Sequence, residues 1–178
     1  MTKKQTVSVI IPTLNAEPWL DDLLSALLRQ TLLPDEILLV DSGSSDNTLK
    51  IAERYVREHS FFRLIAIKKE EFDHGGTRTM AARQSSGDIL LFMTQDAVPA
   101  DNTALELLLR PFAENNNLAA AYGRQLPAKD ATFFSEHLRL FNYPEKSQLR
   151  CLRDWKIYGF KTVFISNSFA AWRHDLLK

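Results

Sequence analysis

Short apolar runs recur along the first two thirds of the chain, separated by polar or amphipathic stretches. The runs at residues 7–11, 37–40, 62–67, 89–93 and 118–122 have the length of β-strands, and the first, second and fourth are almost entirely apolar. Such runs are typical of strands that are buried on both faces, as in parallel sheets. The pattern therefore predicts five strands, most of them in one buried sheet.

Amphipathic patterns lie between these runs. The clearest follows Pro18, which is tolerated in a first helical turn, and we expect Asn15 to cap this helix. Its apolar positions recur at the spacing of one helix face: Leu20, Leu23, Leu24, Leu27 and Leu28. Further helices are predicted around residues 49–56, 80–84 and 102–114. This alternation predicts an α/β fold, a mostly parallel sheet with helices on both faces.

The pattern weakens after Gly123. Residues 124–154 are rich in aromatic and charged side chains and show a weak helical signal at 132–141, whereas 162–165 resembles one more strand. Residues 172–178 resemble the start of a helix, and we expect the sequence to be C-terminally truncated. We predict a single domain over residues 1–178, in two parts that meet near residue 123, of which the second, 124–178, is incomplete.

Composition narrows the class of protein. Lys plus Arg and Asp plus Glu both number 22 among 178 residues, and a nucleic-acid-binding protein usually has a basic excess. No apolar run approaches the roughly 20 residues that a membrane-spanning helix needs. The single cysteine, Cys151, cannot form an internal disulfide and suits a reducing compartment. The composition therefore favours a cytoplasmic globular protein without a nucleic-acid partner.

The candidate chemistry lies where the predicted strands end. Thr13 and Asn15 follow the first strand, Asp41 ends the second and Asp96 follows the fourth. Because ligands of open α/β sheets bind beyond the carboxyl ends of the strands, we expect these side chains to converge. Asp41 could accept a hydrogen bond from a pyrimidine imide N–H, and Asp96 could hold a hard cation such as Mg²⁺ together with phosphate.

A glycine-containing segment at residues 73–78 could add to this site. It is expected to be a loop, and its two glycines permit close backbone approach to a ligand. Arg78 at its end could help to neutralise a diphosphate. The glycine-rich fingerprints of dinucleotide-binding and P-loop proteins follow none of the strands.

Three segments resemble the nucleotide-binding half of glycosyltransferase family 2, whose members have the A-type glycosyltransferase fold. They are Val-Ile-Ile-Pro-Thr-Leu-Asn at 9–15, Val-Asp-Ser-Gly-Ser-Ser-Asp at 40–46, and the run at 86–92 that leads to Gln95 and Asp96. The segment Phe-Asp-His-Gly-Gly-Thr-Arg at 72–78 resembles the rhamnosyltransferase branch. The likeness is strong over residues 7–98 and resumes at 164–168. It implies that residues 1–123 are the nucleotide-binding half and residues 124–178 an incomplete acceptor-side half.

The resemblance implies both an activity and roles for particular residues. It implies inverting transfer of a sugar, L-rhamnose from dTDP-L-rhamnose, to a saccharide or lipid-linked saccharide in bacterial surface polysaccharide synthesis. By this resemblance, the nucleotide-binding residues are Pro12, Thr13, Asn15, Asp41, Arg78 and Gln95. It assigns Mg²⁺ or Mn²⁺ to Asp96, the last aspartate of the family's Asp-x-Asp motif, whose first position is Thr94 here. The family's catalytic base lies beyond residue 178, so no base is assigned.

Two alternatives stay open at this point. A nucleotide-sugar-binding module without turnover would explain Thr94, because a hydroxyl brings no charge to the metal. A nucleotidyltransferase is the third hypothesis, although its usual glycine-rich basic loop is replaced by Pro12-Thr13-Leu14-Asn15. Peripheral association with the inner face of the membrane would have to come from residues outside this sequence or from residues 124–154.

Overall fold

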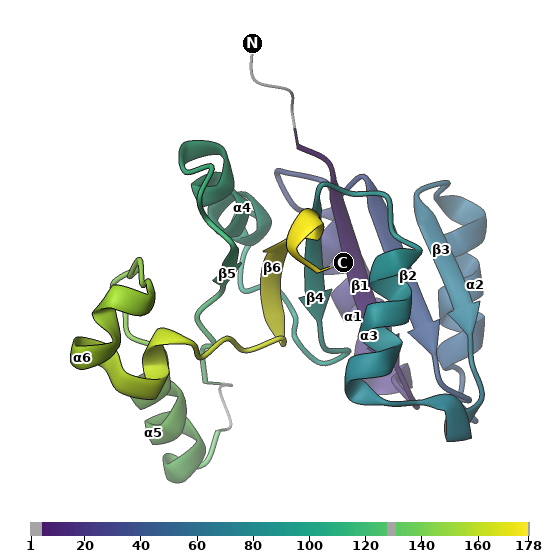
Figure 1. Cartoon of the computed structure of the whole chain (residues 1–178). Helices are drawn as coiled ribbons and strands as arrows, with labels where there is room; N and C mark the ends of the chain where they lie inside the picture. Colours follow the sequence, from purple (N-terminus) through teal and green to yellow (C-terminus); the bar gives the residue numbers. More distant parts are fainter. Residues whose placement is uncertain (1–4, 128–130, 178) are drawn as a thin grey trace.

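The computed structural model describes residues 5–127 and 131–177, which form one six-stranded sheet with flanking helices (Figure 1). The strand order is β3-β2-β1-β4-β6-β5. The central strands β1 (Val7–Thr13), β2 (Glu36–Asp41), β3 (Phe62–Ala66) and β4 (Ile89–Met93) are parallel. β6 (Phe169–Arg173) is antiparallel to β4 and to β5 (Ala120–Tyr122). The predicted mostly parallel α/β sheet is confirmed.

Helices cover both faces of the sheet, as predicted. α1 (Glu17–Leu28), α2 (Thr48–Glu58) and α4 (Ala104–Glu114) pack with the side chains of one face, and α3 (His74–Arg83) packs on the other. Successive residues of a strand point to opposite faces, so Ile11 lies in the first core and Ile10 in the second. The nearly unbroken apolar runs of β1, β2 and β4 follow from this double burial.

Two sequence-based expectations about helix starts were wrong. Asn15 does not cap α1; it has φ +48° and its side chain accepts a hydrogen bond from the backbone of Ser45. Residues 73–78 do not form a loop, because α3 begins at His74. The Asp73 carboxylate accepts hydrogen bonds from Gly75 N and Gly76 N and so satisfies the first free amides of this helix.

The end of the chain also differs from the sequence-based expectation. The strand predicted at 162–165 is absent there: η3 (Gly159–Thr162) is a 3-10 turn, and the strand is β6, seven residues further along. Trp172 belongs to β6 and not to a helix, and only the short 3-10 turn η4 (His174–Leu176) follows. Residues 169–173 form a strand because β4 and β5 pair with them on both sides; Trp172, for example, pairs with both Leu90 and Ala120.

Residues 131–164, called the lobe below, stand apart from the layers of the sheet (Figure 1). The lobe contains α5 (Phe133–Asn142), the 3-10 turn η2 (Leu152–Asp154), α6 (Trp155–Tyr158) and η3. The rings of Tyr143 and Phe164 pack with Tyr122 of β5 at centroid distances of 6.2 and 5.9 Å and so join the lobe to the sheet. The weak helical signal at 132–141 is confirmed by α5. Among the described residues, no helix has the length and apolar character needed to cross a membrane.

A buried carboxylate ties the opposite, amino-terminal edge of the sheet together. Glu36 at the start of β2 is 6% exposed; it accepts hydrogen bonds from Ser8 Oγ and from Ser86 N at 3.0 Å, and it forms an ion pair with Arg63. Gly87 N in turn donates to Ser8 Oγ at 2.9 Å. Burial alone would raise the pKa of Glu36, but these three partners outweigh it and hold the pKa below its ordinary value of 4.5.

Replacing Glu36 by glutamine is expected to lower the free energy of unfolding at neutral pH by about 1–3 kcal/mol, with solvent screening of the half-exposed Arg63 favouring the lower end. A depressed folded-state pKa contributes stability above the unfolded pKa that disappears as pH falls through the folded value. The difference between wild type and Glu36→Gln should therefore shrink below about pH 4.5. Urea unfolding across this range, with the exposed Glu53→Gln as control, measures it. A difference independent of pH would contradict the assignment.

Candidate functional site

The turn after β2 is organised by the carboxylate of Asp41. This residue is 1% exposed, and its Oδ2 accepts hydrogen bonds from Gly43 N at 3.0 Å and Ser44 N at 2.9 Å. Its Oδ1 accepts from the hydroxyls of Ser44 and Thr13, the latter at 3.1 Å. Gly43 completes the turn at φ +86°, which a residue with a side chain rarely adopts. Asp41 therefore fixes the backbone at the carboxyl end of β2.

Two further contacts bring the ends of β1, β2 and β4 together. Asn15 Oδ1 accepts from Ser45 N at 2.9 Å and so joins the chain after β1 to the turn after β2. Gln95 joins β1 to the chain after β4: its Oε1 accepts from Leu14 N at 2.8 Å and its Nε2 donates to Leu14 O at 3.1 Å. The predicted convergence of the strand-end residues is thus seen directly. Pro12, Thr13, Asn15, Asp41 and Gln95 all lie at this one edge.

Asp96 lies one residue beyond Gln95 at the same edge. Its side chain is exposed, and the described residues offer its carboxylate neither a hydrogen bond nor an ion pair. The turn that presents it is closed by Ala97 N donating to Thr94 O at 3.1 Å. Within residues 5–127 and 131–177 there is no group of three or more His, Cys, Asp or Glu side chains placed to share a metal ion. A cation here would take one carboxylate from the protein and its remaining oxygens from a ligand or water, which suits Mg²⁺.

A cleft of about 460 Å³ adjoins these strand ends on the face covered by α3. Its walls are the first turns of α3, including His74 and Arg78, and Phe92, Asn167, Trp172 and Leu177 on the other side. Ser168, next to Asn167, accepts a hydrogen bond from Thr94 N at 3.3 Å, so the cleft borders the turn that presents Asp96. The structure thus places Arg78 in the wall of a cleft that borders the Thr94–Ala97 turn but is not lined by the strand-end residues themselves.

The guanidinium of Arg78 is only partly satisfied inside this cleft. Its Nη1 donates to His74 O at 2.9 Å, but its buried Nε has no hydrogen-bond partner among the described residues. Burial lowers the pKa of Arg78, although guanidinium groups stay protonated at neutral pH. A half-buried guanidinium in a cleft wall is a favourable place for an anionic group of a ligand.

Two features of this cleft were not predicted from the sequence. Asp73 caps the amino terminus of α3, the helix that carries Arg78. The backbone amides of Gly76 and Gly75 donate to the Asp73 carboxylate and lower its pKa. The aspartate three residues before Gly76 was a possible N-cap signal, but the glycines favoured a loop. Trp172 Nε1 donates to Asn167 Oδ1 at 3.1 Å and thereby fixes the far wall, a contact that depends on the end of β6 and has no local signal.

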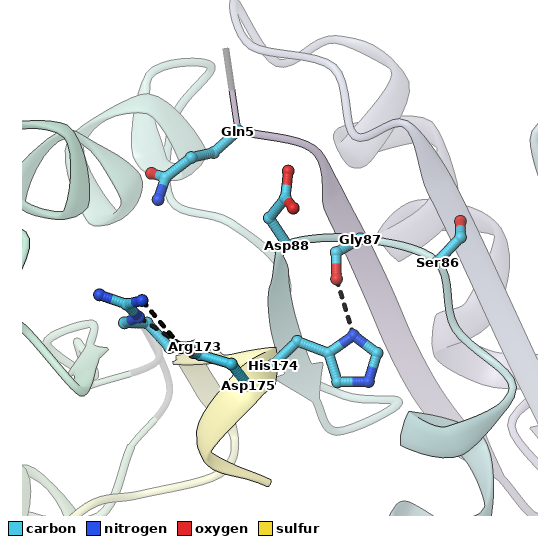
Figure 2. Close-up of a pocket in the computed structure, with 7 residues that line it drawn as sticks. All are labelled: Gln5, Ser86, Gly87, Asp88, Arg173, His174 and Asp175. Atoms are coloured by element: carbon cyan, nitrogen blue, oxygen red, sulfur yellow. Dashed lines mark hydrogen bonds and ion pairs between the residues drawn. The ribbon is translucent and has the colours of Figure 1, made fainter. Parts of the chain in front are cut away.

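A second hollow of similar size, about 450 Å³, lies at the other end of the sheet (Figure 2). It is lined by residues that precede β1 and β4 and by the turn after β6, and His174 Nδ1 lies 2.8 Å from Gly87 O there. Because it lies at the amino ends of the parallel strands, it has no contact with the strand-end residues above. The cleft beside α3 is therefore the better candidate for the ligand site.

Known proteins are similar to this chain in sequence or in fold. Residues 8–178 match the family model described as glycosyl transferase family 2. The O-antigen chain rhamnosyltransferase RfbN of Salmonella typhimurium is 41% identical over 173 residues, which cover 97% of this chain and 54% of the relative. The chain thus spans about half the length of this curated relative.

Solved structures support the fold at lower sequence identity. Staphylococcus aureus TarS 1–349 in complex with UDP-GlcNAc superposes with a TM-score of 0.72 at 23% identity, over 97% of this chain and 46% of that one. The mannosyltransferase PcManGT of Pyrobaculum calidifontis, in complex with GDP-Man and Mn²⁺, gives 0.53 at 20% identity over 99% and 46%. These likenesses concern the fold alone, which is the A-type glycosyltransferase fold. By its match over residues 8–178 and its identity to RfbN, the chain belongs to glycosyltransferase family 2.

Proposed function

We propose that the chain is the donor-binding part of an inverting glycosyltransferase. Its donor is dTDP-L-rhamnose, and its acceptor is a saccharide or lipid-linked saccharide of a bacterial surface polysaccharide. The observation that supports this most directly is the gathering of Thr13, Asn15, Asp41 and Gln95 at the carboxyl edge of the sheet, the edge that also carries the exposed carboxylate of Asp96. Arg78 in the wall of the neighbouring cleft adds a positive charge. The identity to an O-antigen rhamnosyltransferase supports the choice of sugar.

In this proposal the strand-end residues bind the thymine nucleoside. Pro12 and Thr13 end β1. Beyond them, Asn15 binds the backbone of Ser45 after β2, and Gln95 after β4 binds the backbone of Leu14. Asp41 accepts the imide N–H of the base. Since all four hydrogen bonds to its carboxylate are already made, the Ser44 hydroxyl must turn away from Oδ1 when the base arrives. A rotating hydroxyl makes this exchange inexpensive.

Asp96 is the proposed ligand of Mg²⁺ or Mn²⁺, and Arg78 is the proposed partner of the diphosphate. The metal would neutralise charge that develops on the departing diphosphate. With Thr94 in place of a second carboxylate, the protein contributes less charge to this ion, so its affinity depends more on the nucleotide. The catalytic base belongs to the acceptor side, and we assign it to no residue of this chain. The site of action in this proposal is the cytoplasm, at the inner face of the membrane.

Isothermal titration of the 178-residue chain with dTDP, with and without Mg²⁺ or Mn²⁺, tests donor binding. We expect dTDP to bind more tightly with metal, and UDP or GDP to bind more weakly. Absence of dTDP binding by folded protein would overturn the proposal. Transfer is tested separately with dTDP-rhamnose and a lipid-linked acceptor in a protein as long as the relatives. Donor binding without any transfer in that protein would favour a binding module.

Replacing Arg78 by glutamine is expected to weaken dTDP binding by about tenfold or more, because a charge-assisted hydrogen bond contributes roughly 1.5–3 kcal/mol. Binding of thymidine, which lacks the diphosphate, should change little. Arg83→Gln, an exposed arginine on the same helix, is the matched control. Titration of both ligands into both variants measures the effect. Equal losses for thymidine and dTDP would place Arg78 at the base instead.

A further inference from the structure

The amphipathic helix of the lobe has its apolar side turned to solvent. Phe133 and Phe134 of α5 are each 78% exposed and Phe141 is 64% exposed, whereas most leucines of α1 and α4 are buried in the core. On the other side of α5, Arg139 faces inward and donates to Gln125, which itself donates to Ser166 at 3.0 Å. An ordinary surface helix has the reverse orientation.

The same character extends over the rest of the lobe. Most of the exposed large hydrophobic side chains among the described residues lie between 133 and 164, and Leu152, Ile157 and Phe160 are exposed by 78%, 74% and 83%. The ring of His137 is stacked between Phe133 and Phe141, with centroid distances of 6.4 Å to each, so the aromatic stripe along α5 is continuous. A contiguous apolar patch of this kind marks an interaction surface.

Charge indicates what the surface binds. The lobe contains six basic residues and three acidic ones, whereas the rest of the chain contains 16 basic and 19 acidic residues. Lys146, Arg153 and Lys156 are exposed, and Lys161 Nζ lies 4.2 Å from the centroid of the Phe141 ring. Pairing with a second copy would bring two positive lobes together, which like-charge repulsion disfavours. Basic side chains beside exposed Phe, Leu and Trp are the composition of segments that lie in the interface of an anionic bilayer.

We propose that the lobe binds the anionic surface of a lipid bilayer, with the Phe133–Phe134–Phe141 side of α5 inserted among the headgroups and the basic side chains on the lipid phosphates. The lobe joins the sheet through Tyr122, Tyr143 and Phe164, next to Ser166 and Asn167. Docking in this way holds the cleft beside α3 near the membrane surface. This inference does not depend on sugar transfer.

Co-sedimentation with vesicles of phosphatidylcholine, with or without about 30% phosphatidylglycerol, tests the proposal on the 178-residue chain. We expect binding to the anionic vesicles alone, weakened by salt because exposed charges are screened. Phe133→Gln/Phe134→Gln should lower the partition coefficient roughly tenfold or more. Lys146→Gln and Lys156→Gln should each lower it about fivefold. The matched controls, Leu33→Gln/Leu107→Gln and Lys50→Gln, lie outside the lobe and should bind as wild type does.

The single cysteine gives a second readout, because the lobe of the wild-type chain can be labelled without introducing a new cysteine. Cys151 is exposed there, and an environment-sensitive fluorophore attached to it should shift to shorter wavelength with anionic vesicles. A label at Lys50→Cys in a Cys151→Ser background should not shift. Equal binding to neutral vesicles, or no binding, would overturn the proposal. Sedimentation velocity without lipid gives the remaining outcome, because a dimer lost in Phe133→Gln/Phe134→Gln would assign the surface to a second copy.

Discussion

Asp41→Ala is expected to lower the free energy of unfolding by about 3 kcal/mol and to abolish measurable dTDP binding. The carboxylate accepts four hydrogen bonds in a buried position, and its loss leaves Gly43 N and Ser44 N without their acceptor. Hydrogen bonds to charged groups contribute roughly 1.5–3 kcal/mol each, and water can replace part of this at the exposed turn. For a domain of this size the change corresponds to a melting temperature lower by roughly 6–12 °C.

The control for stability is Asp22→Ala, because Asp22 is an exposed carboxylate on α1 and its loss should change the unfolding free energy by less than about 0.5 kcal/mol. A ligand-based control separates the turn from the base contact. N3-methyl-dTDP lacks the imide N–H, and it should bind wild type about tenfold or more weakly than dTDP does. Equal affinity for the two ligands would show that Asp41 organises the turn without touching the base.

Asp96→Asn is expected to remove the metal dependence of dTDP binding while leaving the fold intact. The carboxylate is exposed and forms no hydrogen bond or ion pair with the described residues, so stability should change by less than about 0.5 kcal/mol. Loss of a direct metal ligand should lower the affinity for Mn²⁺ by at least roughly 10–100-fold. That is the loss found when only a residue that hydrogen-bonds a metal ligand is replaced. The measurement is dTDP titration at a series of Mn²⁺ concentrations. A variant that keeps the full gain from Mn²⁺ would exclude Asp96 as the ligand.

The complementary substitution is Thr94→Asp, which places a second carboxylate two residues before Asp96. Added ligand charge should raise the affinity for Mn²⁺ in the absence of nucleotide. Thr94 is partly buried and its N donates to Ser168 O, so thermal unfolding must first show that the variant is folded. An unchanged Mn²⁺ affinity in folded Thr94→Asp would mean that position 94 points away from the ion.

Much of the fold was predictable because buried strands and amphipathic helices have strong local patterns. The runs that became β1, β2 and β4 are apolar on both faces, and the leucines of α1 recur at helical spacing. The gathering of Thr13 and Asp41 also followed from these patterns, since parallel neighbours end at the same edge. The polar residues at the carboxyl edge could therefore be predicted from the sequence before their geometry was known.

Other elements depended on contacts that the local sequence does not contain. The segment 169–173 became a strand because β4 and β5 offered it pairing on both sides, while 162–165, with its better strand pattern, had no partner. Asn15 does not cap α1 because its side chain accepts a hydrogen bond from Ser45 N, thirty residues away. The outward orientation of α5 was equally hidden, because periodicity measures how apolar residues are grouped and not which way the group faces.

Local patterns were enough to predict the α/β class, the mostly parallel sheet and the set of polar residues at its carboxyl edge, because burial on two faces and short-range propensity act within a few residues. The packed molecule adds that the Thr13 hydroxyl of β1 completes the four hydrogen bonds to Asp41, that Arg78 lies in a cleft wall, and that the aromatic side of α5 faces solvent. These features depend on which distant segments meet. Hydrogen-bond partners and exposure are properties of the packed molecule and not of any one stretch of chain.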